Sequence, residues 1–218
     1  MSDPGALLQL SSPALPVGAY SYSQGLERAI EDGDVRDADS AGRWIGDALA
    51  LVLGRYEAPL WLRLRAAWDA GDEPRFARWN AELIATRETR ELRAETLQMG
   101  YSLRQLLCAL GHDDPLSGED LCYPVAHAWA SACWDIAPLA ALHGYLYGWA
   151  ENQVMAAIKA VPLGQLAGQR LLLALRPRIA EVVAGAQRLD DDALSTQAPL
   201  LALASSRHEI QYSRLFRS

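Results

Sequence analysis

Lysine is almost absent from this sequence: Lys159 is the only one among 20 basic residues in a chain of 218. The basic residues are outnumbered by 27 acidic ones, and the formal net charge at pH 7 is −7. Such a chain repels a phosphate backbone on average, so we expect no nucleic acid as a principal ligand. The dominance of arginine favours planar, multidentate ion pairs of the kind found in partly buried sites and protein interfaces.

Cysteine is also sparse, and the chain has no long hydrophobic run. Cys108, Cys122 and Cys133 are odd in number, and no charged-then-apolar leader follows Met1. These features favour reduced thiols in a cytoplasmic protein. The longest apolar stretch, residues 198–204, is far shorter than the roughly 20 residues that a membrane-spanning helix requires. We therefore expect no membrane segment.

Common catalytic motifs are missing as well. No glycine-rich loop ends in Gly-Lys-Ser/Thr, and Gly164 with Gly168 does not have the spacing of a dinucleotide fingerprint. Ser21 and Ser23 lack the flanking glycines of a nucleophile elbow. We expect these serines in turns or helix caps. The sequence thus indicates a protein that is not an enzyme and needs no cofactor.

Metal ligation is the main alternative to this interpretation. Cys108 and His112 are four residues apart, as on one side of a helix, and His208-Glu209 begins like a zincin motif. Tyr212 stands where that motif needs its second histidine. Isolated buried Cys and His residues usually serve packing. A metal-dependent enzyme or metal-binding protein that uses Cys108, His112 and His208 stays open as the second hypothesis.

Helical periodicity dominates what is present. Apolar residues recur at i, i+3, i+4 and i+7 in several separate segments, for example at Ile45, Leu49, Val52 and Leu53. Together with glycine, proline and aspartate breakers, the pattern predicts helices near 24–32, 40–54, 56–70, 74–110, 119–133, 137–160, 164–175 and 177–188. The predicted fold class is all-α, a single-domain multi-helix bundle.

The two ends of the chain are predicted to differ from the bundle. Residues 1–23 contain a cluster of proline and glycine and are expected to form an extended N-terminal segment. Residues 24–189 form the helical body. Residues 190–218 begin with three aspartates and are expected to form a solvated connector and a C-terminal arm.

Two side-chain groups on the predicted helices suggest contacts. Most tryptophans fall among apolar neighbours at helical spacing and are expected in the core, but Tyr145, Tyr147 and Trp149 could form an exposed aromatic face, which is a candidate dimer interface. Glu88, Glu91 and Glu95 share one side of a helix and border its apolar face. These carboxylates are expected to need cationic partners, unless ordinary i, i+4 pairs and water satisfy them.

Three stretches of this sequence resemble a known family. They are residues 12–27 (SPALPVGAYSYSQGLE), residues 89–100 (Thr89 to Met99-Gly100), and Pro162-Leu163-Gly164-Gln165 together with residues 213–218 (SRLFRS). In this order and spacing they resemble the UreF family of urease accessory proteins. The resemblance implies an all-α homodimeric scaffold that binds UreD (UreH) and the GTPase UreG and helps to deliver nickel to apo-urease. It brings no catalytic residue.

The C-terminal arm is the first candidate for partner binding. Its dense apolar and arginine content is typical of an interface hot spot, and the family resemblance implies that it engages UreD. The candidate residues, with two tyrosines of the N-terminal segment, are Tyr20, Tyr22, Arg207, Tyr212, Arg214, Leu215, Phe216 and Arg217. Because the arm has little apparent local core, we expect it to be ordered only against another surface. Removing residues 207–218 should then leave the body folded.

The missing phosphate-binding loop gives a first prediction. The purified chain alone should hydrolyse no GTP, because it has neither the loop nor the lysine that would hold the phosphates. Phosphate release from GTP measures this. Turnover that persists through further purification would contradict the prediction.

Overall fold

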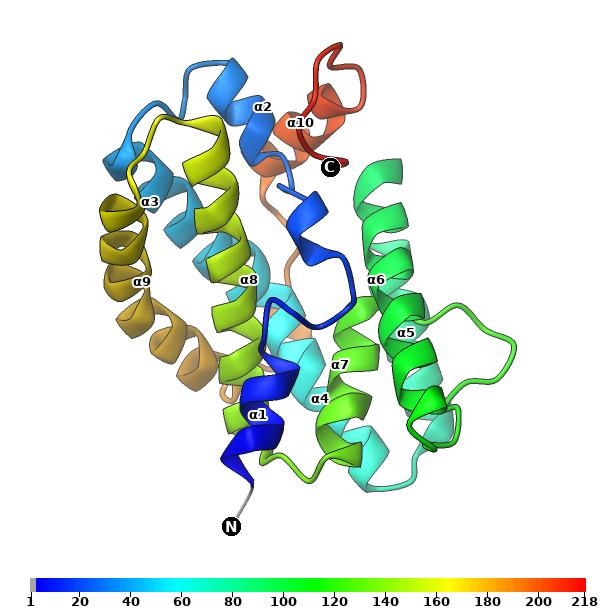
Figure 1. Ribbon diagram of the computed structural model, residues 1–218. Coiled ribbons are helices and arrows are strands. Elements are labelled where there is room, and N and C mark those ends of the chain that lie inside the picture. The colour runs from blue at the N-terminus through cyan, green and yellow to red at the C-terminus, as the bar shows by residue number, and fades with distance from the viewer. Residues whose placement is uncertain (1–2) are drawn as a thin grey trace.

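Helices make up the architecture of the described chain. The computed structural model describes residues 3–218, in which no strand is found (Figure 1). This confirms the all-α class. In chain order the α-helices are α1 (Pro4–Leu10), α2 (Leu26–Glu31), α3 (Ala38–Ala48), α4 (Ala58–Asp69), α5 (Glu73–Ala85), α6 (Arg90–Ala109), α7 (Tyr123–Cys133), α8 (Pro138–Ala160), α9 (Gln165–Ala186) and α10 (Pro199–His208). Between them lie the 3₁₀ turns η1 (Ala19–Ser21) and η3 (Asp191–Ala193) and the π-helix η2 (Leu49–Glu57).

The α4 helix is the centre of the bundle. It contacts α5, α7, α8, α9 and η2, and Leu60, Trp61 and Leu64 on it are completely buried. Arg65 is also buried, and its guanidinium donates to the carbonyl of Ile136 at 2.8 Å and to the hydroxyl of Ser131 at 3.0 Å. The core therefore forms around an element that exposes little of its surface.

The predicted helix 74–110 is divided in two. The α5 helix ends at Ala85, and α6 begins after Thr89, whose hydroxyl accepts a hydrogen bond from the Leu92 amide at 3.2 Å. A threonine in this N-cap position satisfies an amide at the start of the helix. Because apolar residues continue at helical spacing on both sides of the break, periodicity alone did not reveal it.

Two predicted breaks are absent. The chain stays helical from α3 through η2 into α4, and α9 continues through Pro177. A proline inside a helix normally removes a hydrogen bond and favours a break. Pro177 is exposed, whereas Leu172, Leu175 and Ile179 beside it are buried. Burial of this face against the bundle outweighs the local preference of proline.

The prediction that residues 1–23 form an extended segment is wrong for part of its length. Pro4–Leu10 forms α1, and the Asp3 carboxylate caps it by accepting from the Gly5 amide at 2.8 Å. The helix packs against α7 and α8 through its buried Leu10. Met1 and Ser2 lie outside the described residues. A seven-residue helix is too short to give a clear periodic pattern, so the sequence did not reveal it.

Gly100 on α6 sets the distance between α6 and the start of α7. A Cβ atom at this position would lie 1.9 Å from the carbonyl oxygen of Leu121. The end of a flexible side chain can move away to relieve such a contact, but backbone atoms cannot. Only glycine therefore permits this approach.

We predict that Gly100→Ala destabilises the protein by about 1–3 kcal/mol or more, because the inserted methyl group overpacks the contact. Gly185→Ala is the matched control: Gly185 also lies in a helix, and its added Cβ would meet nothing within 4 Å. The control should raise stability slightly, since alanine favours the helix. Urea denaturation measures both changes. Equal stability of the two variants would contradict the claim that only glycine at position 100 permits the close contact with Leu121.

Candidate functional site

The C-terminal segment is folded against the helical body. The α10 helix contacts α2, and the chain after it returns beside α2 (Figure 1). Phe216 is only 6% exposed and packs in a cluster with Leu26, Ala29 and Val161. The expectation that this arm has no local core is therefore wrong. The residues that form its core lie in α2 and at the end of α8, far away in the sequence, so local composition gave no sign of them.

Glu27 joins the start of the body to the end of the chain. Its carboxylate accepts hydrogen bonds from the backbone amides of Leu215 at 2.6 Å and Phe216 at 3.0 Å. The same carboxylate lies 3.1 Å from Nε2 of His208. Glu27 is buried, and a buried carboxylate needs such donors to offset the loss of water.

His208 lies between two carboxylates. Its Nε2 faces Glu27, and its Nδ1 lies 2.7 Å from Oε2 of Glu91 in α6. Arg214 adds an ion pair, from its guanidinium to the second oxygen of Glu91 at 2.5 Å. We call Glu27, Glu91 and His208 the clasp.

The acidic stripe has two different kinds of partner. Glu91 pairs with Arg214, which confirms the expectation of a cationic partner for this residue, and it also contacts His208. That expectation is wrong for Glu95, whose oxygens accept from two neutral groups, the Gln24 amide and the Ser218 hydroxyl, each at 2.6 Å. Burial raises the pKa of Glu95 to about 7, although these hydrogen bonds and the charge of Arg87 oppose the shift. Burial also raises the pKa of Glu88.

Some candidate partner-binding residues are exposed and others are not. Tyr212 is completely exposed, Leu215 is 70% exposed and Tyr20 is 67% exposed. Tyr22 and Phe216 are buried within the chain, so they offer no surface. The arginines of the segment are exposed as well: Arg207, Arg214 and Arg217. Of these, Arg207 lies 3.5 Å from Asp32.

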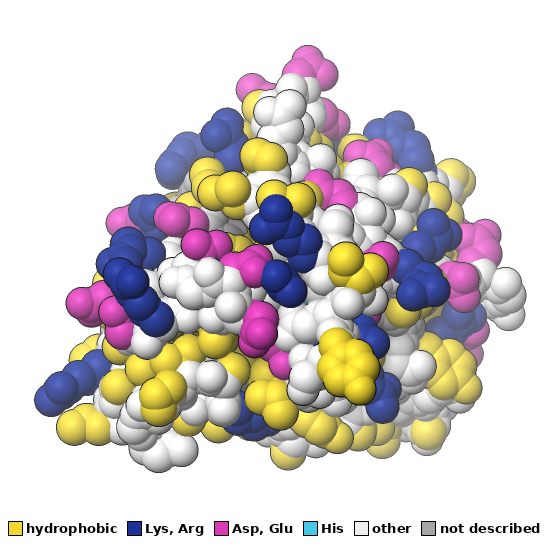
Figure 2. Space-filling model, turned by 90° about the horizontal axis from the view of Figure 1, so that it is seen from above, with side chains coloured by type: hydrophobic (Ala, Val, Ile, Leu, Met, Phe, Trp, Pro, Cys, Tyr) yellow, Lys and Arg dark blue, Asp and Glu magenta, His cyan; other side chains and the backbone are white. Residues whose placement is uncertain are grey.

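The molecule presents apolar side chains at this end. Figure 2 looks onto the end that carries α2, α10 and the chain terminus, and shows hydrophobic side chains in small groups among arginines and carboxylates. The exposed large apolar residues of the C-terminal segment are Leu200, Leu203, Ile210, Tyr212 and Leu215. Exposed apolar side chains with charged neighbours suit protein contact.

The prediction that Tyr145 belongs to an exposed aromatic face is wrong. This residue is 6% exposed, and its hydroxyl donates to Glu57. Trp149 is partly buried, and its indole donates to Gln24 at 2.7 Å. Tyr147 is also partly buried. Because α8 packs against α4, α7 and α9, most of its surface is covered, which the aromatic pattern alone could not show.

The proposed metal ligands are not brought together. His208 contacts Glu91, which precedes Cys108 on the same helix by 17 residues, or about 25 Å at 1.5 Å per residue. His112 follows the far end of that helix. Within residues 3–218, no three His, Cys, Asp or Glu side chains are grouped as a metal site would require. One site built from Cys108, His112 and His208 is therefore excluded.

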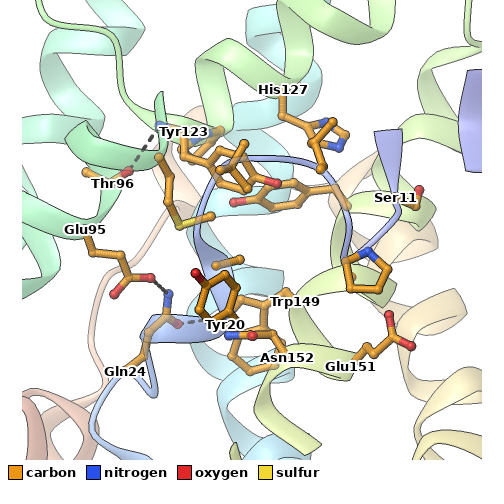
Figure 3. A pocket seen from close by; sticks show the side chains of 18 of the residues that line it. Ser11, Tyr20, Gln24, Glu95, Thr96, Tyr123, His127, Trp149, Glu151 and Asn152 are labelled. Carbon is orange, nitrogen blue, oxygen red and sulfur yellow. Dashed lines mark hydrogen bonds between the residues drawn. The ribbon is translucent and has the colours of Figure 1, made fainter. Parts of the chain in front are cut away.

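A pocket of about 310 Å³ lies beside the clasp and was not anticipated from the sequence. Its lining comes from the loop after α1 and from η2, α6, α7 and α8. Figure 3 shows Glu95, Gln24 and Trp149 on one side and Tyr123 and His127 on another. We call it the central pocket.

The wall of the central pocket contains charged and neutral titratable groups. Glu57, at the end of the π-helix η2, accepts from Tyr145 and pairs with Arg87. Burial lowers the pKa of His127 to about 3, so this ring is neutral at physiological pH, and its Nδ1 has no hydrogen-bond partner within residues 3–218. π-Helical turns often occur at functional sites.

Comparison with known proteins identifies the family. The UreF family profile matches residues 35–176. Relatives named urease accessory protein UreF are 53% identical in Dechloromonas aromatica (97% of this chain, 96% of the relative), 56% in an Azoarcus species (97% and 94%) and 52% in Delftia acidovorans (98% and 96%). The chain belongs to the UreF family.

Three of the segments that carried the UreF resemblance meet at the clasp. Residues 12–27 contribute Glu27, residues 89–100 contribute Glu91, and residues 213–218 contribute the two amides that Glu27 binds. The sequence motifs of the UreF family thus correspond here to one physical assembly. Of the helices in the described part of the chain, none has the length and apolar character needed to cross a membrane.

The raised pKa of Glu95 predicts a change of stability with pH. Because the folded state disfavours the ionised carboxyl, stability should fall as the pH rises from about 4.5 to about 7. Glu95→Gln removes this titration and keeps an amide oxygen that can accept a hydrogen bond. Between pH 4 and pH 8 the wild type should lose about 2–4 kcal/mol of unfolding free energy relative to the variant.

Urea denaturation of both proteins across this pH range measures the difference. Acid acts on His127 in the opposite direction, since its lowered pKa removes stability as the pH falls. That contribution is common to the two proteins and cancels in the comparison. A difference that does not vary with pH would contradict the burial of an ionisable Glu95.

Proposed function

We propose that this chain is a non-catalytic scaffold in the maturation of urease. Its relatives are named urease accessory proteins, which supports a role in this process. The structural observation that carries the proposal is the clasp, because it fixes a chain end whose apolar residues stay exposed. A fixed apolar surface is the property that a scaffold needs. The proposed place of action is the cytoplasm.

The proposed partner at this end is UreD, also called UreH. Tyr212 and Leu215 offer apolar contact area, and Arg214 offers a charge that can fix the register of a complex. Because Phe216 and the Glu27 contacts already order the segment, little conformational entropy remains to be lost on binding. The GTPase UreG and apo-urease are proposed to join through the resulting complex.

A homodimer is also part of the proposal. Tyr145 is removed from the candidate interface because it is buried inside the chain. Tyr147 and Trp149 remain as candidates. The second hypothesis, a metal-dependent enzyme or metal-binding protein, has no assembled ligand set among the described residues to support it.

Two substitutions should separate folding from partner binding. Tyr212→Ala should leave stability within about 0.5 kcal/mol of wild type, because the side chain is fully exposed. It should weaken UreD binding by about tenfold or more if Tyr212 is a contact residue. Phe216→Ala should instead destabilise the protein, by about 3–5 kcal/mol if the cavity does not collapse.

Co-purification with UreD and UreG, followed by titration of UreD, measures these effects. Leu8→Ala is the matched control, since Leu8 is 71% exposed and lies on α1 at the opposite end of the molecule (Figure 1). The control should bind UreD as wild type does. Full UreD affinity of Tyr212→Ala would place the docking surface elsewhere, with Tyr20 and its loop as the next candidate.

A further inference from the structure

The central pocket has an excess of negative charge that the proposed scaffold role does not use. Glu57 in its wall is neutralised by Arg87. Within residues 3–218, Glu95 has only neutral hydrogen-bond donors, and Glu151, whose pKa is raised by burial, has no ion-pair partner. Lys159 also lines the pocket. One more carboxylate than cation therefore surrounds the space when all are ionised.

Aromatic rings form much of the remaining wall. The pocket is lined by Met99 and by the rings of Tyr20, Tyr123, Tyr145 and Trp149. Glu95 lies on the same side as Trp149 (Figure 3). The faces of aromatic rings attract cations, and this attraction grows where water is excluded. Tyr20 is exposed at the rim, whereas Tyr145 is buried. The rings thus extend from the entrance to the interior.

His127 belongs to the buried inner wall of the central pocket. It is 1% exposed, it lines the pocket, and its Nδ1 has no hydrogen-bond partner within the described chain. Buried polar atoms are rarely left without a partner. With the ring neutral and its proton on Nε2, Nδ1 is an acceptor. This atom is closed to the open space of the pocket, so it does not distinguish between charged and neutral ligands.

We propose that the central pocket binds a small organic cation, an alkylammonium or alkylguanidinium group, with its charged end at Glu95 and its alkyl part along Met99 and Tyr145. The volume of about 310 Å³ suits a small molecule. An anion would face Glu95 and Glu151 without compensation. A neutral apolar molecule would leave Glu95 without a charged partner.

Titration calorimetry on the full chain tests the proposal with four small probes that each carry a short alkyl chain. These are n-butylguanidinium, n-butylammonium, neutral butyramide and anionic butyrate. At least one cation should bind at least tenfold more tightly than the neutral and anionic probes. At pH 6 its binding should also release protons, seen as a dependence of the enthalpy on the buffer, because a cation favours the ionised form of Glu95.

Three variants locate the binding. Glu95→Gln should lower cation affinity at least tenfold and abolish proton release, and Tyr20→Ala should weaken binding without loss of stability because Tyr20 is exposed. Glu119→Gln is the control, since Glu119 is exposed and lies outside the pocket. Circular dichroism confirms that each variant is folded.

Three results would overturn the proposal, and a further probe identifies the source of the cation. Equal affinity of Glu95→Gln and wild type, equal binding of butyramide and the cations, or no binding of either cation at millimolar concentration overturns the proposal. A capped arginine, N-acetyl-arginine amide, distinguishes the sources of the cation. Tighter binding of capped arginine than of n-butylguanidinium supports the proposal with a protein side chain as ligand, and the reverse supports it with a free small molecule.

Discussion

The buried carboxylate of Glu27 is the interaction on which the arrangement of both chain ends depends. It receives two backbone amides and one imidazole nitrogen from a segment more than 180 residues away. Without these donors, the carboxylate would be buried and uncompensated, which costs several kcal/mol. The segment after α10 is therefore fixed in one position relative to α2. The exposed side chains of this segment are therefore held in a fixed position as well.

The same polar network extends from the chain end to the central pocket. Ser218 and Gln24 both donate to Glu95, and Gln24 accepts from Trp149 in the pocket wall. Ser23 adds a backbone contact, donating from its amide to the Ser218 carbonyl at 2.9 Å. A partner at the chain end and a ligand in the pocket would thus act on one connected set of hydrogen bonds. Coupling between them has a physical route.

Sequence patterns predicted the parts of this structure that depend on local spacing. The long helices follow their apolar periodicity, and the acidic stripe follows from the placement of Glu91 and Glu95 on one side of α6. Patterns were insufficient where a contact joins distant segments. The cluster around Phe216, the burial of Tyr145 and the central pocket all result from tertiary packing. Packing also overrode the local preference of Pro177 to break α9.

Family motifs and physical reasoning contributed different information about the site. The resemblance pointed to residues 12–27, 89–100, 162–165 and 213–218, but it did not show that three of these segments meet at the clasp. Composition indicated a C-terminal arm that binds a partner. An arm that is free in solution and an arm that packs against the body have the same composition, however. The difference lies in the apolar surface of α2 and α8 that covers Phe216. Such a surface is formed only when the helices are assembled.

Hydrogen exchange resolved to single amides tests the central claim most directly. In the free protein, without any partner, the amides of Leu215 and Phe216 bond to a buried carboxylate, so they should exchange many times more slowly than in an unstructured peptide. In Glu27→Ala this protection should be lost. Exchange of these two amides at the unstructured rate in the free wild-type protein would contradict the account, because the segment would then be fixed only by its partner.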